Sequence, residues 1–229
     1  MRRTVTAEIL DSPDCPPEEV ALSLHDLGRI NRWFGGVSTS QSLIERVARV
    51  TGSKRFSLLE VAAGFGDVPK TVERNLARRG IELEITLLDL VRSHLLPGDR
   101  TLVADALALP FHDDAFDLVS CNLFVHHLEP DDVRRFAREA LRVSRRAVLI
   151  NDLVRDRLHL ALVYSGFPLM KSRASRADGV ASVRRAYVPE EMRDLITSVF
   201  PNGSAPQVEI FRHYLFRMGV IVWKPDATR

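Results

Sequence analysis

The stretch Leu58-Leu59-Glu60-Val61-Ala62-Ala63-Gly64-Phe65-Gly66-Asp67 decides the fold. Its apolar first half is typical of a buried strand, and the residues that follow, 68–79, have the pattern of a helix. Between strand and helix, residues with little or no side chain let the backbone approach a ligand closely. The stretch therefore predicts a strand, a ligand-binding turn and a helix, which together begin an α/β sheet.

A second apolar run, Glu84-Ile85-Thr86-Leu87-Leu88-Asp89, ends in a carboxylate. It follows the turn by roughly 20 residues, the spacing at which an acid after the second strand reaches a ribose hydroxyl. A nucleotide-like ligand is therefore expected. A dinucleotide fingerprint would place its third glycine where Pro69 stands, which disfavours NAD, and a Walker phosphate loop is absent.

The turn resembles motif I of class I S-adenosylmethionine-dependent methyltransferases, an acidic residue followed by three alternating glycines. Glu60 matches the acid, Gly64 and Gly66 match the last two glycines, and Ala62 replaces the first. The resemblance implies S-adenosylmethionine as the cofactor.

Later segments extend this resemblance over residues 56–152. A third strand is expected to end at Val103-Ala104-Asp105-Ala106, a fourth covers 117–123, a helix covers 130–143, and a fifth strand covers 146–152. A Ser-Arg-Arg connection replaces the usual Lys-Pro-Gly-Gly turn before the fifth strand. The resemblance implies a Rossmann-like seven-stranded, mostly parallel sheet with helices on both faces and an antiparallel last strand.

The chain is expected to form a single domain. Residues 1–52 form an N-terminal helical cap, 53–152 the cofactor-binding core, 153–187 a substrate-side insert, and 188–229 a C-terminal helix and β-hairpin. Helices are predicted over 18–34, 40–51 and 189–200, with a break at Gly35-Gly36, and strands over 208–212 and 215–223.

Composition limits the classes of partner. The net charge of +2 gives no case for nucleic acid. Two cysteines are too few for a disulfide framework. No run approaches the ~18 apolar residues of a membrane helix, and the first residues lack the apolar core of a signal peptide. We expect a cytoplasmic protein with a small-molecule partner and no membrane span.

The resemblance also implies which residues contact each part of the cofactor. It places the methionine part of the cofactor at the turn of residues 60–67. Asp89, with Leu90 beside it, is expected at the ribose, Asp105 with Ala106 at the adenine edge, and Asn122 as a further contact.

Methyl transfer to a hydroxyl needs a base near the carboxyl ends of the fourth and fifth strands. His126, His127 and Asp152 are the candidates there, with His127 favoured as the base and Asp152 assisting. The alternatives are that neither histidine is catalytic and that Asp152 only caps the following structure. A magnesium site at Asn151-Asp152 is disfavoured because no carboxylate stands at Asn122, so no metal is expected.

The acceptor is the least determined part. Residues 122–125 lack the Asn/Asp-Pro-Pro-aromatic motif of methyltransferases that act on exocyclic amines, and the apolar insert suggests a hydrophobic or aromatic acceptor. We expect O-methylation of a phenolic or polyketide-like small molecule. C-methylation of a quinone-type ring, an NAD(P)-dependent reductase and a non-catalytic binding protein are the alternatives, and an RNA methyltransferase is a weaker one because the net charge is near neutral.

Overall fold

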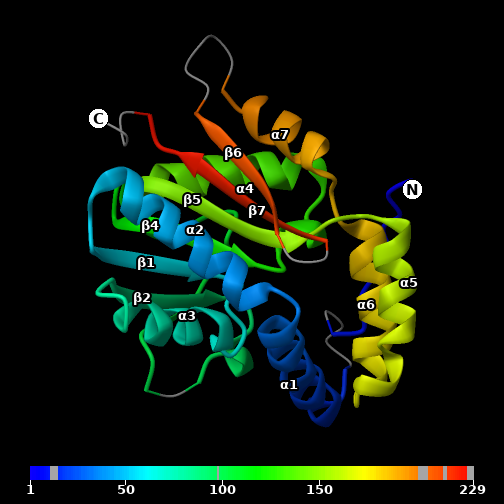
Figure 1. Cartoon of the computed structure of the whole chain (residues 1–229). Helices are drawn as coiled ribbons and strands as arrows, with labels where there is room; N and C mark the ends of the chain where they lie inside the picture. Colours follow the sequence, from blue (N-terminus) through cyan, green and yellow to red (C-terminus); the bar gives the residue numbers. More distant parts are fainter. Residues whose placement is uncertain (11–14, 97, 201–205, 214–215, 226–229) are drawn as a thin grey trace.

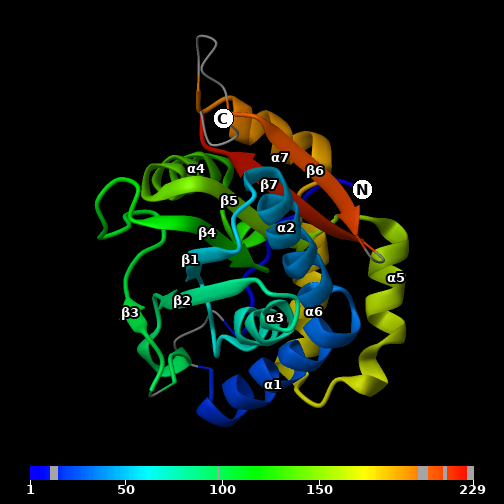
Figure 2. The ribbon, with the colours of Figure 1, turned by 60° about the vertical axis from the view of Figure 1, so that its left-hand side comes forward.

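Strand order follows the expected α/β plan in the computed structural model, which describes residues 1–10, 15–96, 98–200, 206–213 and 216–225. The sheet has seven strands in the order β3-β2-β1-β4-β5-β7-β6. Figure 1 labels all of them except β3, which Figure 2 labels beside β2. Its parallel part comprises β1 (Arg55–Val61), β2 (Glu82–Asp89), β3 (Thr101–Val103), β4 (Phe116–Asn122) and β5 (Ser144–Leu153). The last strand, β7 (Arg217–Trp223), runs antiparallel to β5 and to β6 (Val208–His213). The predicted fold class is confirmed.

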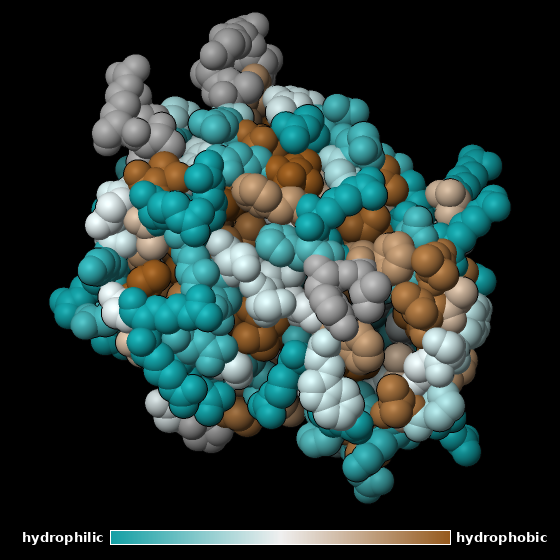
Figure 3. Space-filling model, viewed as in Figure 1, coloured by the Kyte–Doolittle hydropathy of each residue, from teal (hydrophilic) through white to brown (hydrophobic). Residues whose placement is uncertain are grey.

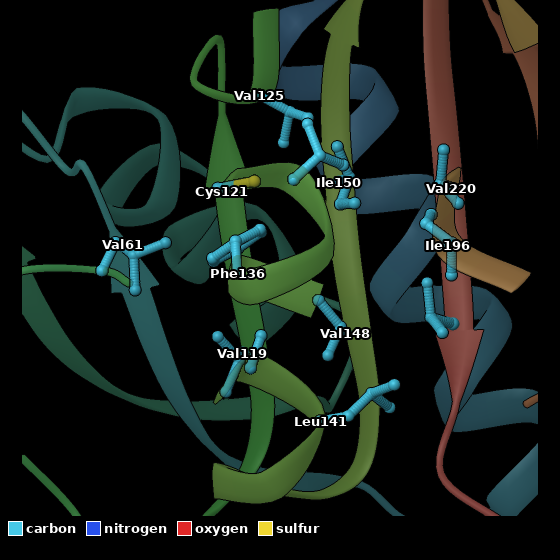
Figure 4. Close-up of a cluster of buried hydrophobic side chains, with 14 of the residues drawn as sticks. Val61, Val119, Cys121, Val125, Phe136, Leu141, Val148, Ile150, Ile196 and Val220 are labelled. Atoms are coloured by element: carbon cyan, nitrogen blue, oxygen red, sulfur yellow. The ribbon is translucent and has the colours of Figure 1, made fainter. Parts of the chain in front are cut away.

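Both faces of the sheet are covered by helices, because the central strands are apolar on both sides. On one face, α2 (Gly36–Thr51) and α3 (Asp67–Ala77) cover a cluster that includes Phe56, Leu58 and Trp223. On the other face lie α4 (Pro130–Val143) and α7 (Pro189–Thr197). Figure 4 shows strand side chains on this second face, such as Val119 and Ile150, around Phe136 of α4 and Ile196 of α7.

Several element boundaries differ from the sequence predictions by a few residues; α7, for example, ends at Thr197 and not at residue 200. Two of the differences have a clear cause. The third strand ends at Val103, before Asp105, because β3 is an edge strand whose last partner on β2 is Asp89. The second helix begins at Gly36 and not at residue 40, because Gly35 turns the chain with a φ of 83° directly into α2. Leu215, the predicted first residue of the last strand, lies outside the described residues.

A third group of helices lies beyond the carboxyl ends of the parallel strands (Figures 1 and 2). It consists of α1 (Pro17–Trp33), α5 (Arg157–Ser165) and α6 (Arg173–Arg185). Asp26 of α1 accepts hydrogen bonds from the N–H groups of Lys171 (2.7 Å) and Ser172 (3.0 Å), at the start of α6. These contacts fix the predicted cap and the predicted insert to each other over the edge of the sheet.

The first ten residues form an extended segment, here called the N-terminal strap (residues 1–10). Its Thr4 N–H donates to the carbonyl of Arg184 (3.1 Å), and the N–H groups of Ile9 and Leu10 donate to Asp178 (2.7 and 3.0 Å). The strap thus follows α6 along its length. Within the described ranges, no helix has the length and apolar character needed to cross a membrane.

Candidate active site

The turn after β1 has the backbone geometry that its small residues predict. Gly64 and Gly66 have φ values of 53° and 71°, and a Cβ on Gly66 would lie 2.6 Å from Leu87 Cδ1. Glycine is favoured at that position, because another residue would have a strained φ and would have to displace the end of the Leu87 side chain. Ala62 also has a positive φ, 51°, which strains a residue that carries a Cβ by roughly 1–2 kcal/mol. Strain of this kind is often found at functional sites.

Asp89 is fixed against this turn at the end of β2. It accepts hydrogen bonds from the N–H groups of Gly64 and Val91, both at 2.9 Å, and His94 Nδ1 lies 3.3 Å away. Burial by itself would raise the pKa of Asp89, but these hydrogen bonds lower it below its ordinary value. An ionised carboxylate has about four lone-pair directions, so Asp89 can still accept hydroxyl donors.

The surface next to Asp89 combines apolar and polar groups. Leu90 is 68% exposed, as single large apolar side chains on a protein surface commonly are. Asp105 is exposed and accepts from the N–H of Leu107 (2.8 Å), whereas Ala106 is buried. Because β3 is paired with β2, Asp89 and Asp105 follow neighbouring strands. The predicted ribose and adenine residues therefore follow adjacent strand ends.

Glu60 and Asn122 belong to a buried polar network. Glu60 is 2% exposed and accepts hydrogen bonds from the Ser120 hydroxyl and from Asn122 Nδ2, the latter at 2.6 Å. Asn122 Oδ1 in turn accepts from Ser40 (2.6 Å) and Asn151 (2.7 Å). Burial raises the pKa of Glu60 to about 7, although the two hydrogen bonds oppose this. Both polar ends of the Asn122 amide are therefore bonded within the protein.

The histidine pair lies in η2 (Val125–His127), a single helical turn after β4. His126 is 2% exposed; its Nδ1 lies 2.6 Å from Asp152 Oδ1, and its N–H donates to Asp152 Oδ2 at 3.0 Å. Burial favours a higher pKa for Asp152, but His126 and the backbone N–H groups lower it overall. The sequence prediction that Asp152 assists His127 requires correction: the carboxylate contacts His126. The turn of η2 decides which of the two histidine rings contacts Asp152, and no periodicity in the sequence reveals this.

A carboxylate that the sequence analysis missed faces both histidines. Glu8, in the N-terminal strap, has one oxygen 3.7 Å from His126 Nε2 and the other 3.7 Å from His127 Nε2. The two rings are 4.2 Å apart, and the His127 side chain is 24% exposed. No motif or periodicity marks Glu8, because its position depends on the strap following α6.

A cavity of about 270 Å³ lies among α1, α5 and the first residues of β7. Its walls are mainly apolar, with Asp26, Arg29 and Arg217 as charged members; the larger side chains are those of Ile30, Trp33, Phe34, Leu162, Leu169, Met170 and Phe216. Figure 3 shows apolar surface in the region of α5. The cavity is lined by residues of the two segments, 18–36 and 153–187, that the sequence places outside the core, together with Phe216 and Arg217; neither His126 nor His127 is among its lining residues.

Arg217 is a buried cation at the wall of this cavity. It donates to Asn31 Oδ1 at 2.6 Å and to the carbonyl of Phe34 at 3.3 Å. Burial lowers its pKa to about 10. These contacts hold the end of α1 against β7.

Comparisons with known proteins agree with this geometry. Residues 59–150 match a family model described as a methyltransferase domain. The fold matches the plantazolicin methyltransferase BpumL in complex with S-adenosylhomocysteine at a TM-score of 0.69 and 13% identity, over 95% of this chain and 94% of that one. A methyltransferase from Aquifex aeolicus matches at 0.57 and 16% identity, over 90% and 98% of the two chains.

The citrinin polyketide synthase CMeT domain structure matches at a TM-score of 0.50 and 14% identity, over 73% of this chain and 46% of that one. The search of curated protein sequences found no match. At these identities the structures establish the fold. The family model describes residues 59–150 as a methyltransferase domain, and S-adenosylmethionine stays the cofactor that the sequence resemblance implies.

Proposed function

We propose that this chain, whose residues 59–150 form a class I S-adenosylmethionine-dependent methyltransferase domain, methylates an oxygen of a phenolic or polyketide-like small molecule. The observation that carries the proposal is the buried pair of His126 and Asp152, 2.6 Å apart. The pair follows β4 and ends β5, at the same edge of the sheet as Asp89 and the turn after β1.

The residues at this edge fit the cofactor. We assign the turn from Glu60 to Asp67 to its methionine part, because the backbone there approaches without obstructing side chains. Asp89 is ionised and suited to the ribose hydroxyls, and the exposed Leu90 suits a flat apolar ring. Asp105 and Ala106 are assigned to the adenine edge. Asn122 acts by holding Glu60 in place.

The bound cofactor supplies an electrophilic methyl group, so the protein's own task is to orient the acceptor and remove its proton. Asp152 accepts a hydrogen bond from Nδ1–H of His126, and in that tautomer Nε2 keeps its lone pair. That arrangement suits a general base that is oriented by a carboxylate. His127, which is more exposed, remains the second candidate for the same role.

The apolar cavity supports a hydrophobic acceptor, since aromatic and aliphatic side chains form most of its wall. A natural-product methyltransferase shares the fold, which supports an acceptor of that class. C-methylation of a quinone-type ring stays an alternative, because a base that ionises a phenol activates both its oxygen and its ring carbons. The methyltransferase domain match decides against the NAD(P)-dependent reductase. We further propose a cytoplasmic location and no nucleic-acid partner, in line with the small net charge of +2.

Methyl transfer from labelled S-adenosylmethionine to a panel of alkylphenols, resorcinols and hydroxyquinones tests the proposal, with NMR of the product to separate O- from C-methylation. His126→Gln and His127→Gln are compared with His112→Gln, which alters an exposed histidine. Loss of the base should reduce turnover by roughly 10²–10⁴-fold and leave S-adenosylhomocysteine affinity unchanged. If both variants keep wild-type turnover, neither histidine is the base, and the protein acts only by positioning the acceptor against the methyl group. Absence of transfer to every phenol excludes the proposed acceptor class.

A further inference from the structure

We propose that Glu8, His126 and His127 bind one divalent transition-metal ion, with zinc as the best-fitting type. One ligand atom from each residue lies within 4.8 Å of the other two. The residues come from segments far apart in the sequence, the N-terminal strap and η2, and Glu8 and His126 are buried. Two imidazoles and one carboxylate form a ligand set that zinc uses in proteins.

The unsatisfied nitrogen of His126 is the strongest reason for a cation. Its Nε2 is buried and, among the described residues, has no hydrogen-bond partner. Nδ1 lies against Asp152, and Nε2 faces the Glu8 carboxylate; in the tautomer with its proton on Nδ1, Nε2 directs a lone pair toward Glu8. Two acceptors facing each other in a buried site repel unless a proton or a cation lies between them.

Distance favours a metal over a shared proton. Each Nε2–carboxylate separation is 3.7 Å, beyond the 2.7–3.2 Å of an ordinary N–H···O hydrogen bond. Two ligands of one zinc ion, with bonds of about 2.0–2.1 Å and angles near or somewhat above tetrahedral, lie ~3.3–3.7 Å apart. The two distances involve different oxygens of Glu8, so binding of one ion would draw together three ligand atoms that now lie within 4.8 Å of one another.

The surroundings also suit a metal. Asp152 on Nδ1 of His126 forms the carboxylate–histidine arrangement that commonly orients metal-binding imidazoles. Ser182 donates to Glu8 Oε1 at 2.8 Å and so fixes the carboxylate. The guanidinium of Arg185 lies 3.9 Å from the same oxygen and opposes a cation. The carboxylates of Glu8 and Asp152 together outweigh its single positive charge.

The inference goes beyond the proposed function, since metal binding requires neither cofactor nor acceptor. If the proposed function is right, a bound dication could lower the pKa of an acceptor hydroxyl placed in an open coordination position. A zinc ion on Nε2 of His126 would replace the base role that the proposed function assigns to that nitrogen, so the metal site and the His126 base exclude each other. Metal binding would also tie the N-terminal strap to η2.

The site is tested by isothermal titration calorimetry, in which Zn²⁺ is added to the full chain prepared without a histidine tag. Wild-type protein should bind one ion per chain, and Glu8→Gln and His127→Gln should weaken binding by at least about 100-fold, the upper end of the effect of losing an outer-shell partner. Glu18→Gln and His112→Gln, which alter exposed residues, should bind zinc as the wild type does. Co²⁺ should give the visible absorption of a tetrahedral nitrogen–oxygen site without a thiolate charge-transfer band, which distinguishes it from binding at Cys15 or Cys121.

Absence of zinc binding would overturn the inference, as would equal binding by wild type and Glu8→Gln. S-adenosylhomocysteine is titrated into the same samples. If S-adenosylhomocysteine still binds but zinc does not, the metal site alone is refuted. If zinc binds but no phenol is methylated, only the proposed acceptor is refuted.

Discussion

Protonation of Glu60 should link the stability of this fold to pH in an unusual direction. Burial raises the pKa of Glu60 from 4.5 to about 7 in the folded protein. Between these two values the folded state binds more protons than the unfolded state, so the free energy of unfolding falls as pH rises. The stabilisation is complete below pH 4.5 and is lost above pH 7.

The size of the effect follows from the shift. One pKa unit corresponds to about 1.4 kcal/mol, so the Glu60 contribution should decrease by about 2.5 kcal/mol between pH 5 and pH 8. Glu60→Gln removes this titration and keeps the side-chain shape. Its amide oxygen can accept from Asn122, and the Ser120 hydroxyl can reorient to accept from its amide nitrogen.

Urea unfolding at pH 5, 6, 7 and 8, at constant ionic strength and without cofactor, measures the difference. The stability of the variant relative to wild type should rise by about 2.5 kcal/mol from pH 5 to pH 8. Other titrating groups are common to both proteins and cancel. Parallel pH dependences would refute the argument, because they would mean that Glu60 is ionised in the fold across this range.

Two further predictions concern the cofactor edge. Asp89→Ala should weaken S-adenosylhomocysteine binding by about 1–3 kcal/mol in calorimetry, because charge-assisted hydrogen bonds are lost; unchanged affinity in a folded variant would remove Asp89 from the site. Ala62→Gly should raise the free energy of unfolding by up to about 1 kcal/mol, because relief of the backbone strain at φ 51° outweighs the added conformational freedom of the unfolded chain. A thermal midpoint below that of the wild type would contradict this prediction.

Local patterns were sufficient for most of the fold. The apolar run before Glu60 and the small residues after it specify a strand and a turn through interactions within a few residues, and β1 and α3 lie where those patterns place them. The predicted ends of helices and strands were less accurate where pairing with a neighbouring element decides them. β3 stops at Val103 because its only partner, β2, ends at Asp89, and that pairing is not visible in the β3 sequence.

For the candidate site, too, some features follow from local sequence and others from tertiary packing. The sequence by itself determined the methyltransferase fold and the order of its strands, because hydrophobic periodicity and turn residues act locally. It also placed the candidate residues at strand ends. Only the tertiary structure decided that Asp152 contacts His126 and that Glu8 faces both histidines, across 26 and more than 100 residues of chain. Such contacts depend on how the strap and η2 pack beside α6, and no local pattern encodes that packing.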